Sequence, residues 1–216
     1  MRIERLEIAR GQSVALLGFD ETTAEVLTNL ITGATVPDAG EVVAFGLSTR
    51  DISDGDEWLK TLDRFGILTG RAVLLDQLTA AQNLAVPFSL ELDDMPQDVR
   101  SRVAALAAEV GLNVEDLDRG VGVLTPAARV RVQLGRALPL DPLLLIAEHP
   151  NALLPPEEVP AFAADFSRVL SRRGAASLVL TADRVFANAV AQEVLTLAPA
   201  TGVLSASAGW RRWFTT

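Results

Sequence analysis

The sequence predicts an α/β protein whose core is interrupted by a mainly helical segment. Apolar runs of strand length alternate with helical patterns in residues 1–71 and again in residues 139–205. Between them, residues 72–138 turn to a helical pattern. We therefore expect the two outer segments to form one α/β core and residues 72–138 to form an inserted helical subdomain. Residues 206–216 would form a tail rich in Trp and Arg.

The first outer segment is expected to open with a strand, a tight turn and a helix. Residues 14–17 are a short apolar run, and the turn follows at Gly18. The helix stops at Gly33, and its apolar face consists of Val26, Leu27, Leu30 and Ile31. The sequence then predicts a turn, a strand, an acidic loop, a helix and a strand, at residues 37–40, 41–45, 51–56, 58–64 and 65–69.

Helix and strand signals continue to the end of the second outer segment. An amphipathic helix follows a loop at residues 91–96 and ends before Gly111, with Val99, Val103, Leu106 and Val110 at helical spacing. Thr125 and Pro126 are typical of a helix start, as N-cap and first helical residue. The last third predicts strands at residues 143–147, 177–181 and 193–198, a helix at 160–172, a short helix before the last strand, and a turn at 201–202.

Composition excludes several classes of function. Of the 216 residues 49% are hydrophobic, which is enough for a substantial core, and the net charge of −9 provides no basic stripe for nucleic acid. The chain has no cysteine, and His149 is its only histidine, so thiolate and multi-histidine metal sites are excluded. No apolar run approaches the ~20 residues of a membrane span, and the N-terminus lacks a signal-peptide pattern. We expect a soluble, cytoplasmic protein.

Residues 13–33 have the layout of a phosphate-binding loop without its phosphate contacts. Such a loop needs glycines that let the backbone approach the phosphates, and a Lys-Ser/Thr pair for phosphate and magnesium. Here Ala24 stands at the lysine position, and Glu25 stands at the position of the magnesium-binding hydroxyl. The positions concerned are Gly18, Glu21, Thr22, Thr23, Ala24 and Glu25.

The side chains of this loop favour a self-capped turn over a nucleotide site. Thr22 and Glu25 have the spacing of a capping box, which would satisfy backbone donors at the helix start. Asp20, Glu21 and Glu25 also place carboxylates where a phosphate would bind. Two like charges ~4 Å apart repel by about 4 kcal/mol at an effective dielectric constant near 20.

The order of segments resembles the nucleotide-binding subunit of ABC transporters over nearly the whole chain, from about residue 8 to residue 205. The likeness lies in VALLG…LTNLITG, PDAGEVVAFG, GILTGRAVLLDQLTAAQNLAVPF, LTPAARVRVQLGRALPLDPLLLIAEHP and SLVLTADRVFANAVAQEVLTL. The resemblance implies a P-loop NTPase-like core of the ABC ATPase type with a mainly helical inserted subdomain.

Measured against that family, each nucleotide motif carries different residues here. Gly70 stands at the glutamine position, and the signature LSGGQ is replaced by Leu124, Thr125, Pro126, Ala127 and Ala128. Glu148 replaces the magnesium-binding aspartate, His149 the general-base glutamate, and Ala182 the switch histidine. Pro155 replaces the dimer-contact aspartate. The resemblance therefore implies no working catalytic residue, no metal site, and ATP with magnesium only if the altered site still binds them.

Two regions leave alternatives open. Thr125 keeps a hydroxyl that could serve a nucleotide held by a partner subunit, but plain helix capping is the simpler reading. The tail has Trp210, Arg211, Arg212, Trp213 and Phe214, a mixture that suits a membrane surface, a protein interface or folding back onto the domain.

We expect a degenerate, non-hydrolysing ABC subunit with a structural or regulatory role in a membrane transport complex, with a weak likeness to systems for lipids or lipoproteins. Its partners would be a permease, a second ABC ATPase-like chain or a second copy, and not nucleic acid. It would lie at the inner face of the membrane, touching it indirectly or through the tail. The alternatives are a divergent ATPase completed by a partner and a stand-alone interaction module.

Overall fold

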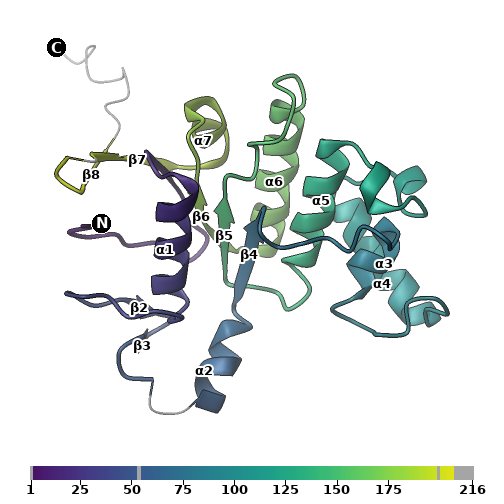
Figure 1. The fold of residues 1–216 in the computed structure, drawn as a ribbon, viewed down its shortest axis with the longest axis horizontal. Helices are drawn as coiled ribbons and strands as arrows, with labels where there is room; N and C mark the ends of the chain where they lie inside the picture. The colour runs from purple at the N-terminus through teal and green to yellow at the C-terminus, as the bar shows by residue number, and fades with distance from the viewer. Residues whose placement is uncertain (1, 53–54, 199, 207–216) are drawn as a thin grey trace.

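The structure, a computed structural model, describes residues 2–52, 55–198 and 200–206. Its main sheet has the strand order β4-β5-β6-β1-β7-β8 (Figure 1). The first five of these strands are parallel, and β8 pairs antiparallel with β7. Their bounds are β1 Ser13–Leu17, β4 Phe65–Thr69, β5 Leu144–Glu148, β6 Ala176–Leu180, β7 Glu193–Ala198 and β8 Val203–Ala206.

Helices cover both faces of the sheet. Figure 1 shows α1 (Glu21–Ile31) on one side and α6 (Val159–Arg173) with α7 (Arg184–Val190) on the other. Successive residues of β1 point to opposite faces, so Val14 and Leu16 pack with α1 while Ala15 and Leu17 pack in the α6–α7 core. Because both faces are covered, the inner strands are predominantly apolar, as the short apolar runs of the sequence predict.

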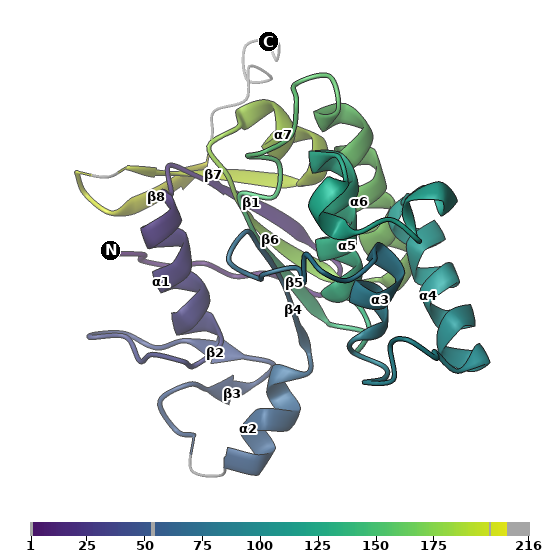
Figure 2. The ribbon, with the colours of Figure 1, turned by 45° about the vertical axis from the view of Figure 1, so that its right-hand side comes forward.

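The inserted segment is helical and lies to one side of the sheet (Figure 2). Its helices are α3 (Ala80–Ala85), α4 (Gln97–Val110) and α5 (Pro126–Arg136), with short 3₁₀ turns at Val114–Asp116 and Val121–Val123. A capping box between Thr79 and Gln82 starts α3, and Gly111, with φ of 75°, ends α4. The exact domain bounds at residues 72 and 138 stay a prediction.

Two ion pairs tie the helical segment to α6. Arg173 donates to both carboxylate oxygens of Glu109 at 2.7 and 2.6 Å, and Arg131 donates to Asp165 at 3.1 and 2.7 Å. The hydrogen bonds to Glu109 also raise the pKa of Arg173 above its ordinary value. Side chains with two parallel N–H donors fix orientation as well as distance, so the helical segment is held to α6 at two points.

The observed fold confirms the predicted α/β class and corrects three local predictions. Val26 is 43% exposed, because the buried side of α1 is formed by Ala24, Leu27 and Thr28. The strand expected at residues 41–45 is instead a short hairpin of β2 (Val43–Ala44) and β3 (Leu47–Ser48). The helix expected at residues 58–64 begins earlier, as α2 (Gly55–Leu62). The predicted turn at residues 201–202 is confirmed, and it leads into a strand that the sequence analysis did not predict, β8.

Among the described residues, every helix is too short or too polar to cross a lipid bilayer.

A cluster of three phenylalanine rings should make a large contribution to stability. Phe162 and Phe166 of α6 and Phe186 of α7 are fully buried, with centroids 5.9 to 6.3 Å apart. Because the substitution Phe162→Ala opens a cavity among close-packed groups, we expect it to lower the free energy of unfolding by about 3–5 kcal/mol. Urea denaturation measures this. The control Val185→Ala removes a side chain that is 76% exposed, and a similar loss there would contradict the cavity explanation.

Candidate functional site

The loop after β1 requires a glycine. Gly18 has φ of 87°, and a Cβ added there would lie 3.0 Å from the carbonyl oxygen of Leu197 on β7. Only glycine adopts this conformation without strain and tolerates the close approach. The loop thus keeps the glycine that turns the chain from strand to helix.

Asp20 caps helix α1, so the expected capping box of Thr22 and Glu25 is wrong. Asp20 Oδ1 accepts a hydrogen bond of 2.7 Å from the backbone N–H of Thr23. The helix begins at Glu21, one residue before Thr22. Asp20, two positions before Thr22, is the N-cap residue because its short side chain reaches the N–H of the third helical residue directly.

The position predicted to replace the lysine lies in the apolar core. Ala24 is fully buried, and Phe19 is 2% exposed. Both pack with Leu27 and with apolar residues of β1, β6 and β7. A long charged side chain at position 24 would displace core atoms, so the surroundings of this position favour a small apolar residue.

An ion-paired cluster joins three elements at the carboxyl ends of β4 and β5. Glu148, the last residue of β5, is 6% exposed and accepts a 2.8 Å hydrogen bond from Thr69 Oγ1 on β4. Arg71 Nη2 lies 2.7 Å from each carboxylate oxygen of Glu148. The other terminal nitrogen of Arg71 forms an ion pair with Glu25 of α1. The guanidinium group therefore lies between two carboxylates that belong to different elements.

Arg71 was not predicted from the sequence, whereas both of its partners were. The sequence places Glu25 at a magnesium-binding hydroxyl and Glu148 at a magnesium-binding carboxylate, and the structure brings the two to the same cation. Gly70, at the predicted glutamine position, is exposed and precedes Arg71 directly. An arginine beside that position was the available signal. That arginine indicates an ion-paired cluster only when the folded chain shows which carboxylates lie within its reach.

His149 adopts a left-handed backbone conformation. Its φ is 45°, and its backbone N–H donates a 2.7 Å hydrogen bond to the carbonyl of Leu180 on β6. Its Nε2 atom is buried without a hydrogen-bond partner among the described residues. Within the described part of the chain, no hydrogen bond or ion pair joins the His149 side chain to a carboxylate that would orient it as a general base, although Asp20 lies close enough to interact with it electrostatically.

A small polar network follows β5 and β6. Asn151 donates to Asp183 Oδ2 at 2.9 Å and accepts from Thr181 Oγ1 at 3.1 Å. Asp183 in turn caps α7 through the N–H groups of Val185 and Phe186. Ala182, at the predicted switch position, is exposed beside this network, and Pro155 is half-buried. The network holds the turns after both strands together.

The predicted start of α5 is confirmed. Thr125 Oγ1 accepts from the N–H of Ala128 at 3.2 Å, and Pro126 is the first helical residue. Leu124, Ala127 and Ala128 are buried. In the described part of the chain, no hydrogen bond or ion pair joins this helix end to the loop at Gly18. The two predicted motifs are therefore separate within one chain.

The basic residues of α5 are ion-paired or bonded to the backbone. Arg129 donates to Val121 O at 3.0 Å and to Asp76 at 3.2 Å. Arg136 donates to Val73 O at 2.9 Å. Among the described residues, no group of three or more acidic or histidine side chains is arranged to hold a metal ion.

No family model matches the chain. Curated relatives are ATP-binding proteins of transport systems. The chain is 27% identical over 187 residues to the lipoprotein-releasing system protein LolD of Alcanivorax borkumensis, covering 87% of this chain and 81% of LolD. It is 32% identical to the ribose import protein RbsA 2 of Burkholderia cenocepacia, covering 82% of this chain but 34% of that protein. It is 28% identical to the methionine import protein MetN of Brucella abortus, covering 89% of this chain and 51% of that protein.

Solved structures with this fold are ATP-binding cassettes. The post-hydrolysis dimer of MJ0796 with ADP and phosphate has a TM-score of 0.76 at 23% identity, covering 93% of this chain and 86% of that one. CbiO1 from Clostridium perfringens has a TM-score of 0.77 at 19% identity, covering 93% and 78%. The fold is that of an ABC ATPase cassette. The chain is thus similar over most of its length to ATP-binding proteins of transport systems, and it shares its fold with ABC ATPase cassettes.

Removing Arg71 should destabilise the cluster and open a place for a divalent cation. Because Arg71→Met leaves buried Glu148 without its charged partner, we expect a loss of about 2 kcal/mol in the free energy of unfolding. Added Mn²⁺ should raise the melting temperature of the variant and not of the wild type, since Glu25, Glu148 and Thr69 provide oxygen ligands.

The matched control is Arg5→Met, which removes a surface pair with Glu7 and should cost less than about 1 kcal/mol. Equal losses in the two variants, or an equal response to Mn²⁺, would contradict a special role for Arg71.

The N-cap of α1 should make stability depend on acidity. Hydrogen bonds from Thr23 hold the pKa of Asp20 below its ordinary value of 3.8. A lowered pKa in the folded state means that the contribution is present above that value and is lost as pH falls. We expect wild type to resist urea better than Asp20→Ala at about pH 6, with the difference shrinking below about pH 4. A pH-independent difference, or the same trend in the exposed loop control Asp118→Ala, would contradict this.

Proposed function

We propose that this chain is a non-hydrolysing ABC subunit with a structural or regulatory role in a membrane transport complex. The observation that carries the proposal is the placement of Arg71 between Glu25 and Glu148. In the family resemblance, those two positions would bind magnesium with the nucleotide. Here one side-chain cation already forms an ion pair with each of the two carboxylates, so both have a charged partner without a ligand.

The loop after β1 supports the same conclusion independently. Asp20 already occupies the backbone N–H of Thr23, a donor at the helix start that a phosphate would otherwise use. Glu21 adds a second carboxylate in the first turn of α1. An anion approaching this helix end meets two negative groups and a donor that is already satisfied. The residues present therefore do not fit a magnesium-bound nucleotide.

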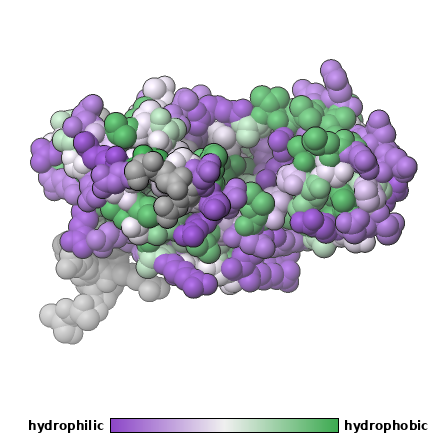
Figure 3. All heavy atoms as spheres, turned by 90° about the horizontal axis from the view of Figure 1, so that it is seen from below, coloured by the Kyte–Doolittle hydropathy of each residue, from purple (hydrophilic) through white to green (hydrophobic). Residues whose placement is uncertain are grey.

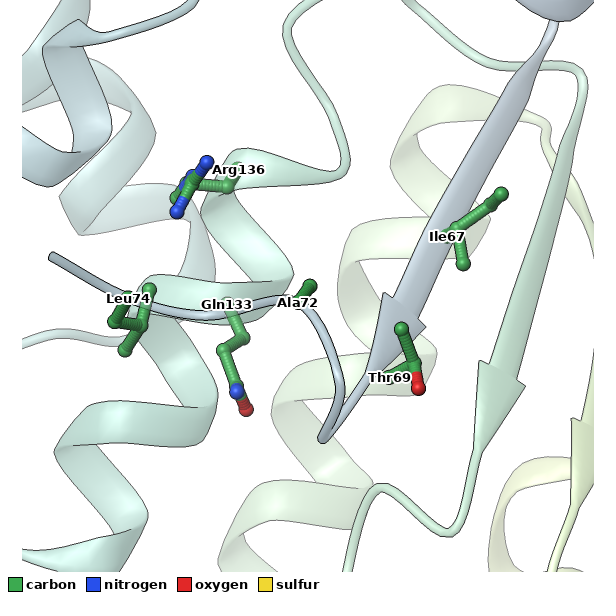
Figure 4. A pocket seen from close by; sticks show the side chains of 6 residues that line it. All are labelled: Ile67, Thr69, Ala72, Leu74, Gln133 and Arg136. Atoms are coloured by element: carbon green, nitrogen blue, oxygen red, sulfur yellow. The ribbon is translucent and has the colours of Figure 1, made fainter. Parts of the chain in front are cut away.

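The helical segment offers a surface for a protein partner. Figure 3 views the molecule from below, and apolar residues gather at its right-hand end, over the helical segment. A cavity of about 170 Å³ lies between β4 and α5 (Figure 4), lined by Ile67, Thr69, Ala72, Leu74, Gln133 and Arg136. In the same segment, Val73 is 73% exposed and Val123 is 69% exposed. Exposed apolar groups beside a hollow are typical of protein interaction sites, and a permease helix is the partner we propose.

A second ATPase-like chain or a second copy is the other proposed partner. The MJ0796 neighbour is described as dimeric, and this chain keeps the Thr125 cap at the start of α5. The hydroxyl of Thr125 is committed to Ala128 N–H, which favours the capping role over service to a partner's nucleotide. The proposed location is the cytoplasmic face of the membrane, where such a complex assembles. The tail, for which a membrane surface, a protein interface and folding back onto the domain were left as alternatives, lies outside the described residues except for Ala206.

The cargo class is proposed only by similarity. LolD is named for lipoprotein release, and the chain covers most of it. RbsA 2 and MetN are named for ribose and methionine import, and the chain covers 34% and 51% of them. Lipoprotein or lipid handling is the cargo class we favour. The alternatives are an ATPase whose chemistry a partner completes and an interaction module outside any transporter.

Calorimetric titration with MgATP tests the proposal. Because Arg71 and Asp20 already fill the cation and phosphate contacts, we expect no heat of binding in the micromolar range at about pH 7.5. The double substitution Glu25→Ser with Arg71→Gln removes the internal ion pairs and serves as a comparison. Urea denaturation measures the stability of this double variant, which should remain folded under the conditions of the titration.

Micromolar binding by the wild-type chain would overturn the non-hydrolysing reading. ATP turnover by the purified complex would favour the completed-ATPase alternative if it were lost on changing His149 or Glu148 of this chain. Turnover that depends only on residues of the partner would support the structural role.

A further inference from the structure

A groove of about 840 Å³ lies at the amino ends of the parallel strands. Residues 3–10 and 39–45 line it, together with the last turn of α1. It also reaches Arg64, Leu144 and Ala176, which lie at or just before the starts of β4, β5 and β6. The ion-paired cluster lies at the carboxyl ends of β4 and β5, so the groove is a separate feature at the opposite edge of the sheet.

The N-terminal wall of the groove is an extended segment. Arg5 and Glu7, two positions apart, form an ion pair of 2.7 Å, because alternate side chains of an extended chain point to the same side. Leu6 and Ile8 alternate with them and are half-buried against the apolar cluster between the sheet and α1. Figures 1 and 2 both place the segment alongside α1 and next to the β2–β3 hairpin. The segment is therefore held on the core by one row of its side chains.

The main chain of this wall is available for pairing. In the described part of the chain, residues 3–8 belong to no strand, and their N–H and C=O groups make no hydrogen bond. Hydrogen bonding begins at Ala9, whose N–H donates to Gln12 Oε1 at 2.8 Å. An extended segment that is held on the core and has unpaired main-chain groups is a template for an added strand.

Apolar side chains along the groove favour a peptide as its occupant. Val43 on β2 is 56% exposed, and Leu143 before β5 is 42% exposed, and both line the groove. A strand added along residues 3–8 would present every second side chain to these apolar groups. A peptide uses the main-chain groups and the apolar surface at the same time, whereas a small ligand would leave most of the main-chain groups unpaired.

The charges of the lining favour an acidic occupant. Glu4 and Glu7 each form an ion pair with a neighbouring arginine, at 3.3 and 2.7 Å. The other charged side chains that line the groove are Arg10, Arg64 and Glu41, and none of the three forms an ion pair within the described part of the chain. Two unpaired arginines against one unpaired glutamate leave the lining with an excess of positive charge. Carboxylates of a partner complement that excess.

We propose that the groove binds an extended segment of a partner protein, which pairs with residues 3–8 as an added strand. Its alternate side chains are apolar and cover Val43 and Leu143, and its other residues include carboxylates that pair with Arg10 and Arg64. Main-chain pairing gives affinity, and the alternation of side chains gives selectivity. The proposal does not depend on whether the chain binds nucleotide, because the ion-paired cluster lies at the opposite edge of the sheet.

Selection from a display library of random peptides, each about ten residues long, tests the proposal on the full chain. The selected sequences should have apolar residues at every second position and more Asp and Glu than Lys and Arg. A synthetic peptide of a selected sequence should slow amide exchange in residues 3–8 at least about tenfold. The same peptide with N-methylated amides should give no protection, because it cannot donate main-chain hydrogen bonds.

A double variant makes the test specific for main-chain pairing. Glu4→Pro with Glu7→Pro removes two N–H groups and places rings where a strand would approach, so the peptide should bind at least about tenfold more weakly. The side chains of Glu4 and Glu7 are 57% and 72% exposed, so the variant should still fold. The matched control is Glu4→Ala with Glu7→Ala, which removes the same carboxylates, keeps the N–H groups and should bind the peptide like the wild type.

Four outcomes would overturn the proposal. The first is a selection that enriches no peptide, and the second is equal binding by the proline and alanine variants. The third is protection of residues 3–8 without any peptide that is unchanged by dilution, since the occupant would then come from the same molecule. The fourth is protection without peptide that rises with protein concentration, since a second copy would then fill the groove.

Discussion

The guanidinium of Arg71 holds together the part of the molecule where β4 and β5 end and α1 begins. It bridges Glu25 on α1 and Glu148 on β5, and Glu148 is also bonded to Thr69 on β4. Glu148 is almost fully buried, so its charge is tolerable only with a cation and hydrogen-bond donors in direct contact. Arg71 therefore links α1 to β4 and β5 at this edge of the sheet, in addition to strand pairing and apolar packing. In this fold, that edge is also where ligands of α/β sheets bind.

The other groups of the same region form their hydrogen bonds and apolar contacts within the chain. Asp20 satisfies a donor at the start of α1, and Phe19 and Ala24 pack into the core beneath it. None of these groups needs a ligand to complete its hydrogen bonds or its packing. His149 is the exception, because its Nε2 is buried without a partner among the described residues. One unsatisfied nitrogen without an orienting carboxylate does not make a catalytic site.

Most of the fold follows from patterns in the sequence. The apolar runs that became β4, β5, β6 and β7 were predicted within one residue at each end, because strands of a sheet covered on both faces are predominantly apolar. Gly111 and Gly174 ended their helices in the left-handed conformation that glycine favours. The errors fell where the signal was weak. Residues 41–45 and the buried face of α1 were misjudged because few residues set the pattern there.

The candidate site was predicted only in part. Glu25 and Glu148 were singled out because their positions in a known layout differ from the expected residues. The helix cap was assigned to Thr22 instead of Asp20, since sequence spacing alone does not show where the first helical turn begins. Arg71 was missed altogether. Its partners are 46 and 77 residues away in the chain, and no local pattern links them.

The sequence by itself determined the α/β class, the order of strands and helices, the start of α5 and the absence of a lysine in the phosphate-like loop. These features depend on residues that are close together in the chain, where periodicity and capping rules apply. Only the tertiary structure decided that Arg71 lies between two carboxylates and that Ala24 is part of the core. It alone also showed that a groove lies between residues 3–10, residues 39–45 and α1. Each of these depends on contacts between distant segments, whose geometry is fixed when the sheet and its helices pack.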